Sequence, residues 1–170
     1  MSKTLLSMIA DEGGEYVDIR FTDPRGKLQH VTVCADQVDE DFIADGFMFD
    51  GSSIAGWKSI EESDMKLMPD ASSAYLDPFY AEKTVCIHCT VVEPDTGESY
   101  ARDPRGCAQR AEAYLVSSGI GDVAYMGPEA EFFLFDDVRF ENKINKVSYE
   151  VDAVDASWNT DSAYEVGNMG

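Results

Sequence analysis

Apolar and polar residues alternate along residues 16–22, which is typical of a β-strand with one face against a core. Residues 23–26 read Asp-Pro-Arg-Gly, an order that favours a tight turn. A second alternating segment follows over residues 27–34. This pattern predicts a β-hairpin. The side chains expected to face the core are Val17, Ile19, Phe21, Val31 and Val33.

Three segments carry the start and stop signals of helices. Ser2 and Asp103 can cap the free N–H groups of the first and third helices, and a glycine after each of the three can adopt the left-handed conformation that ends a helix. The second helix is short and acidic, and the third begins with proline at its first position. The predicted helices are 3–12 between Ser2 and Gly13, 39–44 before Gly46, and 104–118 between Asp103 and Gly119.

The remaining apolar runs predict four further strands, over residues 64–68, 84–92, 123–126 and 129–135. The first two belong with the hairpin, and a turn follows them at residues 93–98. The last two come after the third helix and are expected to open a new sheet. The pattern therefore changes near residue 100, where we expect a domain boundary.

Cysteine spacing predicts no metal site. Cys86 and Cys89 resemble a metal or redox pair, but they lie in a β-branched segment where they would point to opposite faces of a strand. Cys34 and Cys107 supply no second ligand pair for zinc. Free thiols buried in a reducing compartment explain the strand cysteines better.

Composition adds a strong acidic bias. The chain has 170 residues, a formal net charge of −20 and 44% hydrophobic residues. Such a field repels phosphate backbones and anionic lipids, which argues against nucleic-acid or membrane binding. The first apolar patch is cut short by Asp11 and Glu12, so no signal peptide is expected, and no apolar run is long enough to span a membrane. These features predict a soluble, cytoplasmic protein.

Two carboxylates interrupt the most aromatic stretch of the chain. If residues 127–136 form a strand, Glu129 and Glu131 project from the same face, roughly 6–7 Å apart. A pair of hard cations such as Mg²⁺ or Mn²⁺ would offset their repulsion and desolvation. The alternative is an ordinary edge strand with both carboxylates on its solvent-exposed face, and the spacing of the two glutamates alone favours that alternative.

Residues 47–57 have no clean period and are apolar at both ends. They predict an exposed loop in which Asp50 and the hydroxyl of Ser53 stand between the anchors Phe49 and Trp57. The loop lacks the lysine and glycine spacing of a phosphate-binding P-loop. It is either an ordinary Gly/Ser turn or a surface that docks on another molecule.

Taken together, residues 49–57 and 127–136 closely resemble bacterial type I glutamine synthetase. The first reads Phe-Asp-Gly-Ser-Ser-Ile-Ala-Gly-Trp, and the second Gly-Pro-Glu-Ala-Glu-Phe-Phe-Leu-Phe-Asp. The likeness is collinear from the first helix to Gly170. It also includes the segments 21–26, 77–79, 102–106 and 119–122.

The resemblance implies an α+β chain. Residues 1–101 would form an N-terminal β-grasp domain, and residues 102–170 would begin the catalytic α/β domain of the family. The sequence ends before the family's remaining metal ligands and its glutamate- and ATP-contacting residues. Two explanations stay open: a fragment of a longer enzyme, or a truncated relative with another role.

The same resemblance implies a function. The family condenses glutamate with ammonia, using ATP, through γ-glutamyl phosphate. Glu129 and Glu131 would each ligate one of two divalent ions, Mg²⁺ or Mn²⁺, with Glu129 on the nucleotide side. Asp50 would bind ammonium and help to remove its proton, and Ser53 would support that pocket. In the family this loop reaches the active site of the next subunit in a ring-shaped homo-oligomer, a dodecamer.

Two alternatives remain beside the ligase. The chain could be a catalytically inactive module that binds full-length subunits, or part of a relative that joins glutamate to a larger amine. Asp50, Glu129 and Glu131 have no physical role in an inactive module, and an acid in the ammonium loop favours ammonia. We expect the 170-residue chain alone to be inactive, because too few ligands are present to close a site.

Overall fold

The computed structural model describes residues 4–153 and residue 156. Close contacts between residues divide the chain into two compact units, one ending at Ala124 and the other beginning at Tyr125.

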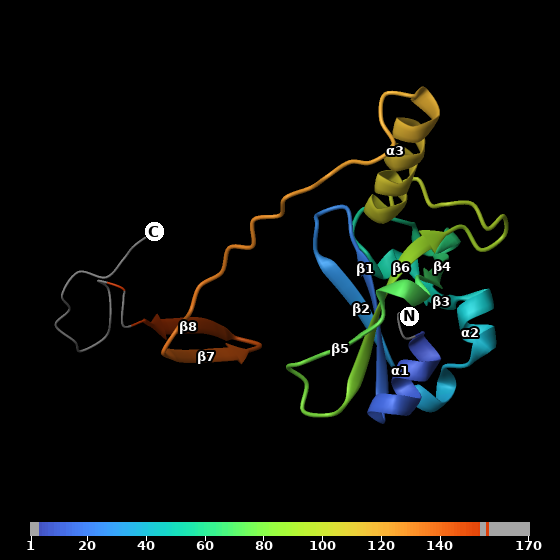
Figure 1. Cartoon of the computed structure of the whole chain (residues 1–170). Coiled ribbons are helices and arrows are strands. Elements are labelled where there is room, and N and C mark those ends of the chain that lie inside the picture. The colour runs from blue at the N-terminus through green and yellow to red at the C-terminus, as the bar shows by residue number, and fades with distance from the viewer. Residues whose placement is uncertain (1–3, 154–155, 157–170) are drawn as a thin grey trace. The chain divides into compact units, whose positions relative to one another are not determined.

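The first unit is built on one six-stranded sheet in the order β2-β1-β6-β4-β3, with the short β5 paired to β6 (Figure 1). The pair β1–β6 is parallel and the other pairs are antiparallel. The central position is taken by β6, which is the last strand of this unit in chain order. The strands are β1 (Tyr16–Thr22), β2 (Leu28–Cys34), β3 (Phe47–Asp50), β4 (Asp64–Pro69), β5 (Tyr75–Leu76) and β6 (Thr84–Val92).

Helices α1 (Leu5–Glu12) and α2 (Glu40–Asp45) lie on the same side of this sheet, and α3 (Pro104–Ser118) follows it in the chain (Figure 1). Between the sheet and the first two helices lies one apolar core. Its fully buried members include Leu5, Ile19, Met65, Leu67 and Ile87. Short 3₁₀ turns occur at Ala35–Gln37, Gly51–Ser53, Ile60–Glu62 and Ala71–Ser73.

The predicted hairpin is confirmed. The strands β1 and β2 pair from Tyr16 opposite Cys34 to Thr22 opposite Leu28. The turn closes with a 2.9 Å hydrogen bond from the Gly26 amide to the Asp23 carbonyl. The predicted core residues of β1 are buried, and the two valines of β2 are half-buried against the core.

The third helix follows the prediction, with Asp103 as its N-cap and Gly119 after its last residue. The second helix lies one residue later than predicted, with Asp39 as its N-cap and Gly46 after its last residue. The start of the first helix was predicted wrongly. Thr4, not Ser2, is the N-cap, because its hydroxyl accepts a 3.4 Å hydrogen bond from the Ser7 amide. The predicted cap Ser2 lies outside the described residues.

The opposite face of the sheet carries a buried polar network. Asp18 is 1% exposed and accepts hydrogen bonds of 2.7 Å from Arg20 Nε, His30 Nδ1 and Thr32 Oγ1. The Arg20 guanidinium also donates to the Tyr75 hydroxyl at 2.5 Å and to Asp77 Oδ2 at 2.8 Å. This network ties β1 to β2 and to the segment around β5.

Within its described residues, the second unit contains one antiparallel hairpin, β7 (Asp137–Lys143) with β8 (Lys146–Asp152), which the sequence pattern did not predict. The predicted strands 123–126 and 129–135 are wrong, because both segments lack regular secondary structure. A strand needs a hydrogen-bonded neighbour, and no described strand pairs with either segment. Their apolar residues are consequently exposed, as Phe132, Phe133 and Leu134 show.

The prediction that the two strand cysteines are buried free thiols is confirmed. Cys86 and Cys89 are buried free thiols on β6, and burial raises their pKa values to about 11 and about 12. Cys34 and Cys107 are exposed and free. Among the described residues, no helix is both long and apolar enough to cross a membrane.

Candidate functional site

Asp50 is the last residue of the short strand β3, where it lies opposite Asp64 of β4. The strand ends because the next residue turns inward: the Gly51 amide donates a 2.6 Å hydrogen bond to the Ser63 carbonyl. Gly51 is buried, and a side-chain carbon there would collide with Met65 Cγ. Glycine is therefore required at this position, and the close approach fixes the backbone beside Asp50.

The Asp50 carboxylate is exposed but hydrogen-bonded. One of its oxygens accepts from the Ser52 amide at 2.9 Å and from the Ser52 hydroxyl at 2.6 Å, which caps the 3₁₀ turn Gly51–Ser53. The Ser52 hydroxyl is the main reason that the pKa of Asp50 lies below its usual value, and the hydroxyls of Ser63 and Ser53 add to the effect. The carboxylate is therefore ionised and faces solvent at neutral pH.

The loop that follows Asp50 has an exposed tip and a buried base. Ser53 is exposed, whereas Ile54 and Trp57 are 8% and 6% exposed. The Trp57 ring packs against three aromatic neighbours, Phe21, Phe49 and Tyr100, with centroid distances of 5.5, 5.9 and 5.4 Å. The predicted exposed tip between apolar anchors is confirmed, but residues 47–50, which were expected to belong to the loop, form strand β3. Residues 50–58 are called the Asp50 loop below.

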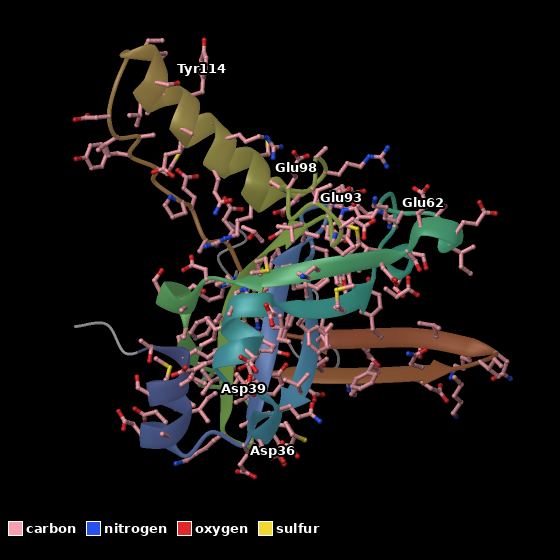
Figure 2. The ribbon with its side chains drawn as sticks, turned by 90° about the vertical axis from the view of Figure 1, so that its right-hand side faces the viewer. Asp36, Asp39, Glu62, Glu93, Glu98 and Tyr114 are labelled. Carbon is pink, nitrogen blue, oxygen red and sulfur yellow. The ribbon has the colours of Figure 1, made fainter. Side chains whose placement is uncertain are left out.

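An acidic pocket of about 590 Å³ adjoins this loop. Ser63 and Asp64, which neighbour Gly51 and Asp50 across the β3–β4 pair, form one side of it. Figure 2 shows Glu62 and Glu93 at this end of the sheet, and both line the pocket. The remaining charged lining residues are Lys58, Glu61 and Asp95.

Glu129 and Glu131 lie in the segment between α3 and β7, and both are exposed. They belong to the second unit, whereas Asp50 and Ser53 belong to the first. Because the segment is not a strand, the expected same-face spacing of the two glutamates does not follow from its backbone.

The donor chemistry of the glutamate pair suits Mg²⁺ or Mn²⁺, which prefer carboxylate oxygen. The pair is not a complete site, since the part of the chain that the structure describes holds no cluster of three or more His, Cys, Asp or Glu side chains able to bind a metal. Glu129 and Glu131 can thus supply two ligands of a larger set, and the other donors must come from elsewhere.

Sequence reasoning missed the part played by Ser52. Its amide and hydroxyl hold the Asp50 carboxylate, and the spacing of Asp, any residue and Ser is the signal of this local turn. The contacts of Lys58 were also missed, because its partner Glu93 lies 35 residues away.

Two family descriptions match the chain in succession. "Glutamine synthetase, beta-Grasp domain" matches residues 13–94, and "Glutamine synthetase, catalytic domain" matches residues 101–168. The first match covers the sheet with α2, and the second covers α3 and the following hairpin. The Asp50 loop lies in the first match, and both glutamates lie in the second.

Curated relatives agree with these matches. The chain is 72% identical over 164 residues to the glutamine synthetase of Cereibacter sphaeroides, and the aligned region covers 96% of this chain and 35% of the relative. It is 69% identical over 167 residues to the glutamine synthetase of Rhodobacter capsulatus, and that aligned region covers 98% of this chain and 38% of the relative. The chain thus spans little more than a third of the length of these relatives.

A solved structure shows the same fold at lower identity. Plasmodium falciparum glutamine synthetase superimposes with a TM-score of 0.65 and 20% identity, covering 91% of this chain and 30% of that one. Residues 13–94, which contain the sheet, accordingly form a β-grasp domain, and the catalytic domain begins at residue 101, before α3 and within the first unit. The chain belongs to the glutamine synthetase family and corresponds to its N-terminal part.

Proposed function

We propose that this chain is the N-terminal part of an ATP-dependent ligase that joins glutamate and ammonia. The observation that carries the proposal is Asp50, an ionised and exposed carboxylate on a loop whose base is buried. The domains are residues 1–101 and 102–170, a division supported by the family matches that end at residue 94 and begin at residue 101.

Asp50 is the ammonium ligand in this proposal. Its lowered pKa keeps the carboxylate charged, which favours electrostatic binding of a small cation. The same low pKa makes Asp50 a weak base, so it assists proton loss chiefly by holding the ammonium where the amine is needed. The Ser53 hydroxyl, also exposed, adds a neutral acceptor to the pocket.

Glu129 and Glu131 are the metal ligands in this proposal, with Glu129 on the nucleotide side. Bound Mg²⁺ or Mn²⁺ would neutralise charge on the phosphoryl group that ATP transfers to glutamate. The exposure of both carboxylates supports this role, since neither is committed to a buried contact.

The site is shared between subunits. We place Asp50 of one subunit beside Glu129 and Glu131 of the next in a ring-shaped homo-oligomer, a dodecamer. Each interface in such a ring is heterologous, and repeated rotation from one subunit to the next closes the ring. The apolar base of the Asp50 loop supports this arrangement, because it gives the exposed tip a rigid support. The protein is cytoplasmic, which suits four free cysteines.

The decisive experiment measures phosphate release by the full-length protein. Release should require glutamate, ATP, a divalent cation and ammonium together. Equal turnover with a polyamine and none with ammonium would exclude this reaction and favour a ligase for a larger amine. The 170-residue chain alone should show no turnover, in line with its incomplete set of metal donors.

Two further measurements test the residue roles in the full-length enzyme. Glu129→Gln or Glu131→Gln should weaken Mn²⁺ binding measured by calorimetry, since each removes a ligand charge. Asp50→Asn should lower turnover with little change in ATP or metal binding. Mixing dissociated Asp50→Asn and Glu131→Gln subunits should restore part of the activity, and no recovery would exclude a shared site.

A further inference from the structure

The Asp50 loop is fastened at its C-terminal end by contacts to one connecting segment, residues 93–102, which joins β6 to α3. Lys58 Nζ lies 2.8 Å and 3.1 Å from the two carboxylate oxygens of Glu93. Arg102 Nη1 donates to the Gly56 carbonyl at 2.5 Å and lies 3.4 Å from the Trp57 carbonyl. A side chain and the backbone of the loop are therefore both tied to this segment.

The Lys58 contact is partly shielded from water. The Lys58 side chain is 19% exposed and that of Glu93 is 34% exposed. The Lys58 ammonium also lies 5.4 Å from the centroid of the Tyr100 ring, which is the ring that packs against Trp57. The ion pair and the aromatic base of the loop thus form one continuous contact.

The charges around Lys58 make its position significant. Five acidic residues line the same pocket, and Lys58 is the cation among its lining residues. Without that cation, the carboxylates on the two sides of the pocket repel each other. One side follows the Asp50 loop in the chain and the other contains Glu93, so this repulsion acts to separate the loop from the connecting segment. The carboxylates are Glu61, Glu62, Asp64, Glu93 and Asp95.

The two ends of the Asp50 loop are held differently. At the N-terminal end, the β3–β4 pair and the Gly51 amide fix the backbone. At the C-terminal end, Gly56 has a φ of +85° and is exposed, so it adds little packing of its own. Lys58 and Arg102 supply the polar contacts on either side of Trp57 that fix this end.

We propose that Lys58, Glu93 and Arg102 are positioning residues that hold the Asp50 loop in the conformation that binds ammonium. The inference rests on the proposed function of Asp50 and assigns a role to residues that touch no reactant. A loosened loop spends a smaller fraction of the time in the conformation that binds ammonium, and the apparent affinity for ammonium falls in proportion to that fraction. High ammonium restores the competent state, so the effect is on KM rather than kcat.

The first test measures hydrogen exchange by mass spectrometry on the 170-residue chain, in peptides that cover residues 50–58. Lys58→Met, which keeps the length of the side chain without its charge, should raise the exchange rate of these peptides at least about fivefold, and Lys58→Arg should restore it. Lys66→Met is the matched control, since Lys66 on the neighbouring strand β4 makes no ion pair with a described residue. Unchanged exchange in Lys58→Met would overturn the proposal.

The second test uses steady-state kinetics of the full-length enzyme. Lys58→Met, Glu93→Gln and Arg102→Met should each raise the KM for ammonium about fivefold, equivalent to roughly 1 kcal/mol, with kcat and the KM for glutamate and ATP little changed. Faster exchange with an unchanged ammonium KM, or an equal loss for all substrates, would overturn the positioning role. If the wild-type enzyme does not use ammonium, the proposed function is wrong. The hydrogen-exchange comparison of wild type with Lys58→Met then decides by itself whether these contacts hold the loop.

Discussion

Removing the Asp18 carboxylate should destabilise the β-grasp unit strongly, because three donors converge on it in a buried position. Asp18→Ala removes the 2.7 Å hydrogen bonds from Arg20, His30 and Thr32. Breaking a buried ion pair by deleting one partner typically costs about 3–5 kcal/mol. The loss here should lie at the low end, about 3 kcal/mol. Arg20 keeps Tyr75 and Asp77 as partners.

The pH dependence gives this prediction a second, independent readout. Burial raises the pKa of Asp18, but hydrogen bonds from Arg20, Thr32 and His30 outweigh it and hold the pKa below its ordinary value. A depressed folded pKa means that the stabilisation is complete above the unfolded pKa, which is about 3.9 for an aspartate. It is lost as the pH falls through the folded pKa. The stability gap between wild type and Asp18→Asn should be constant near neutrality and should narrow below about pH 4.

Urea unfolding followed by circular dichroism measures both quantities. We expect Asp18→Ala to lower the unfolding midpoint with an unchanged denaturant slope, and Asp36→Asn, on an exposed turn, to leave it unchanged. A loss below about 1 kcal/mol for Asp18→Ala would show that the network does not stabilise the sheet. If the difference in unfolding free energy between wild type and Asp18→Asn stays constant down to about pH 3, the charge of Asp18 is not the cause of the stabilisation.

Three further outcomes follow from burial. Gly51→Ala should lower the melting temperature, with a loss of about 1–3 kcal/mol, because its methyl group would meet Met65 Cγ. An unchanged melting temperature would refute the close approach. Leu67→Ala should cost about 3 kcal/mol in urea unfolding, since Leu67 is fully buried in the core, and a loss under about 1 kcal/mol would contradict that packing. A thiol reagent should label the two exposed cysteines of the native chain rapidly and all four after denaturation, and rapid labelling of more than two in the native chain would contradict the burial of the β6 thiols.

Local signals predicted most elements of the first unit, because these elements are marked by neighbours in sequence, but they missed the short strands β3 and β5. The period of β1, the Asp-Pro-Arg-Gly turn and the cap of α3 at Asp103 each depend on a few adjacent residues. Alternation could not show that the polar face of β1 is covered as well. Asp18 is buried because β2 brings His30 and Thr32 to it, while the segment around β5 supplies the other partners of Arg20. These contacts depend on pairing between segments that are distant in sequence.

The candidate site also has one part that its local sequence predicted and one part that it did not. The Asp50 loop was predicted from its own residues, and its exposed tip and buried base are observed. The segment that carries Glu129 and Glu131 has the composition of a strand, yet a strand forms only beside a partner. Aromatic composition therefore predicts where a strand can form, and the pairing decides whether it does.

The central place of β6 has a consequence for the order in which the protein folds during synthesis. Its neighbours β1 and β4 are made first, but Tyr16 pairs with Thr84, 68 positions later in the chain. An isolated hairpin such as β1–β2 is at best marginally stable. The nascent chain therefore presents the apolar face of β1 without its central neighbour until Val92 has left the ribosome. Contacts that close such long loops also slow folding. Before β6 emerges, this apolar face of β1 is open to misassociation and to chaperone binding.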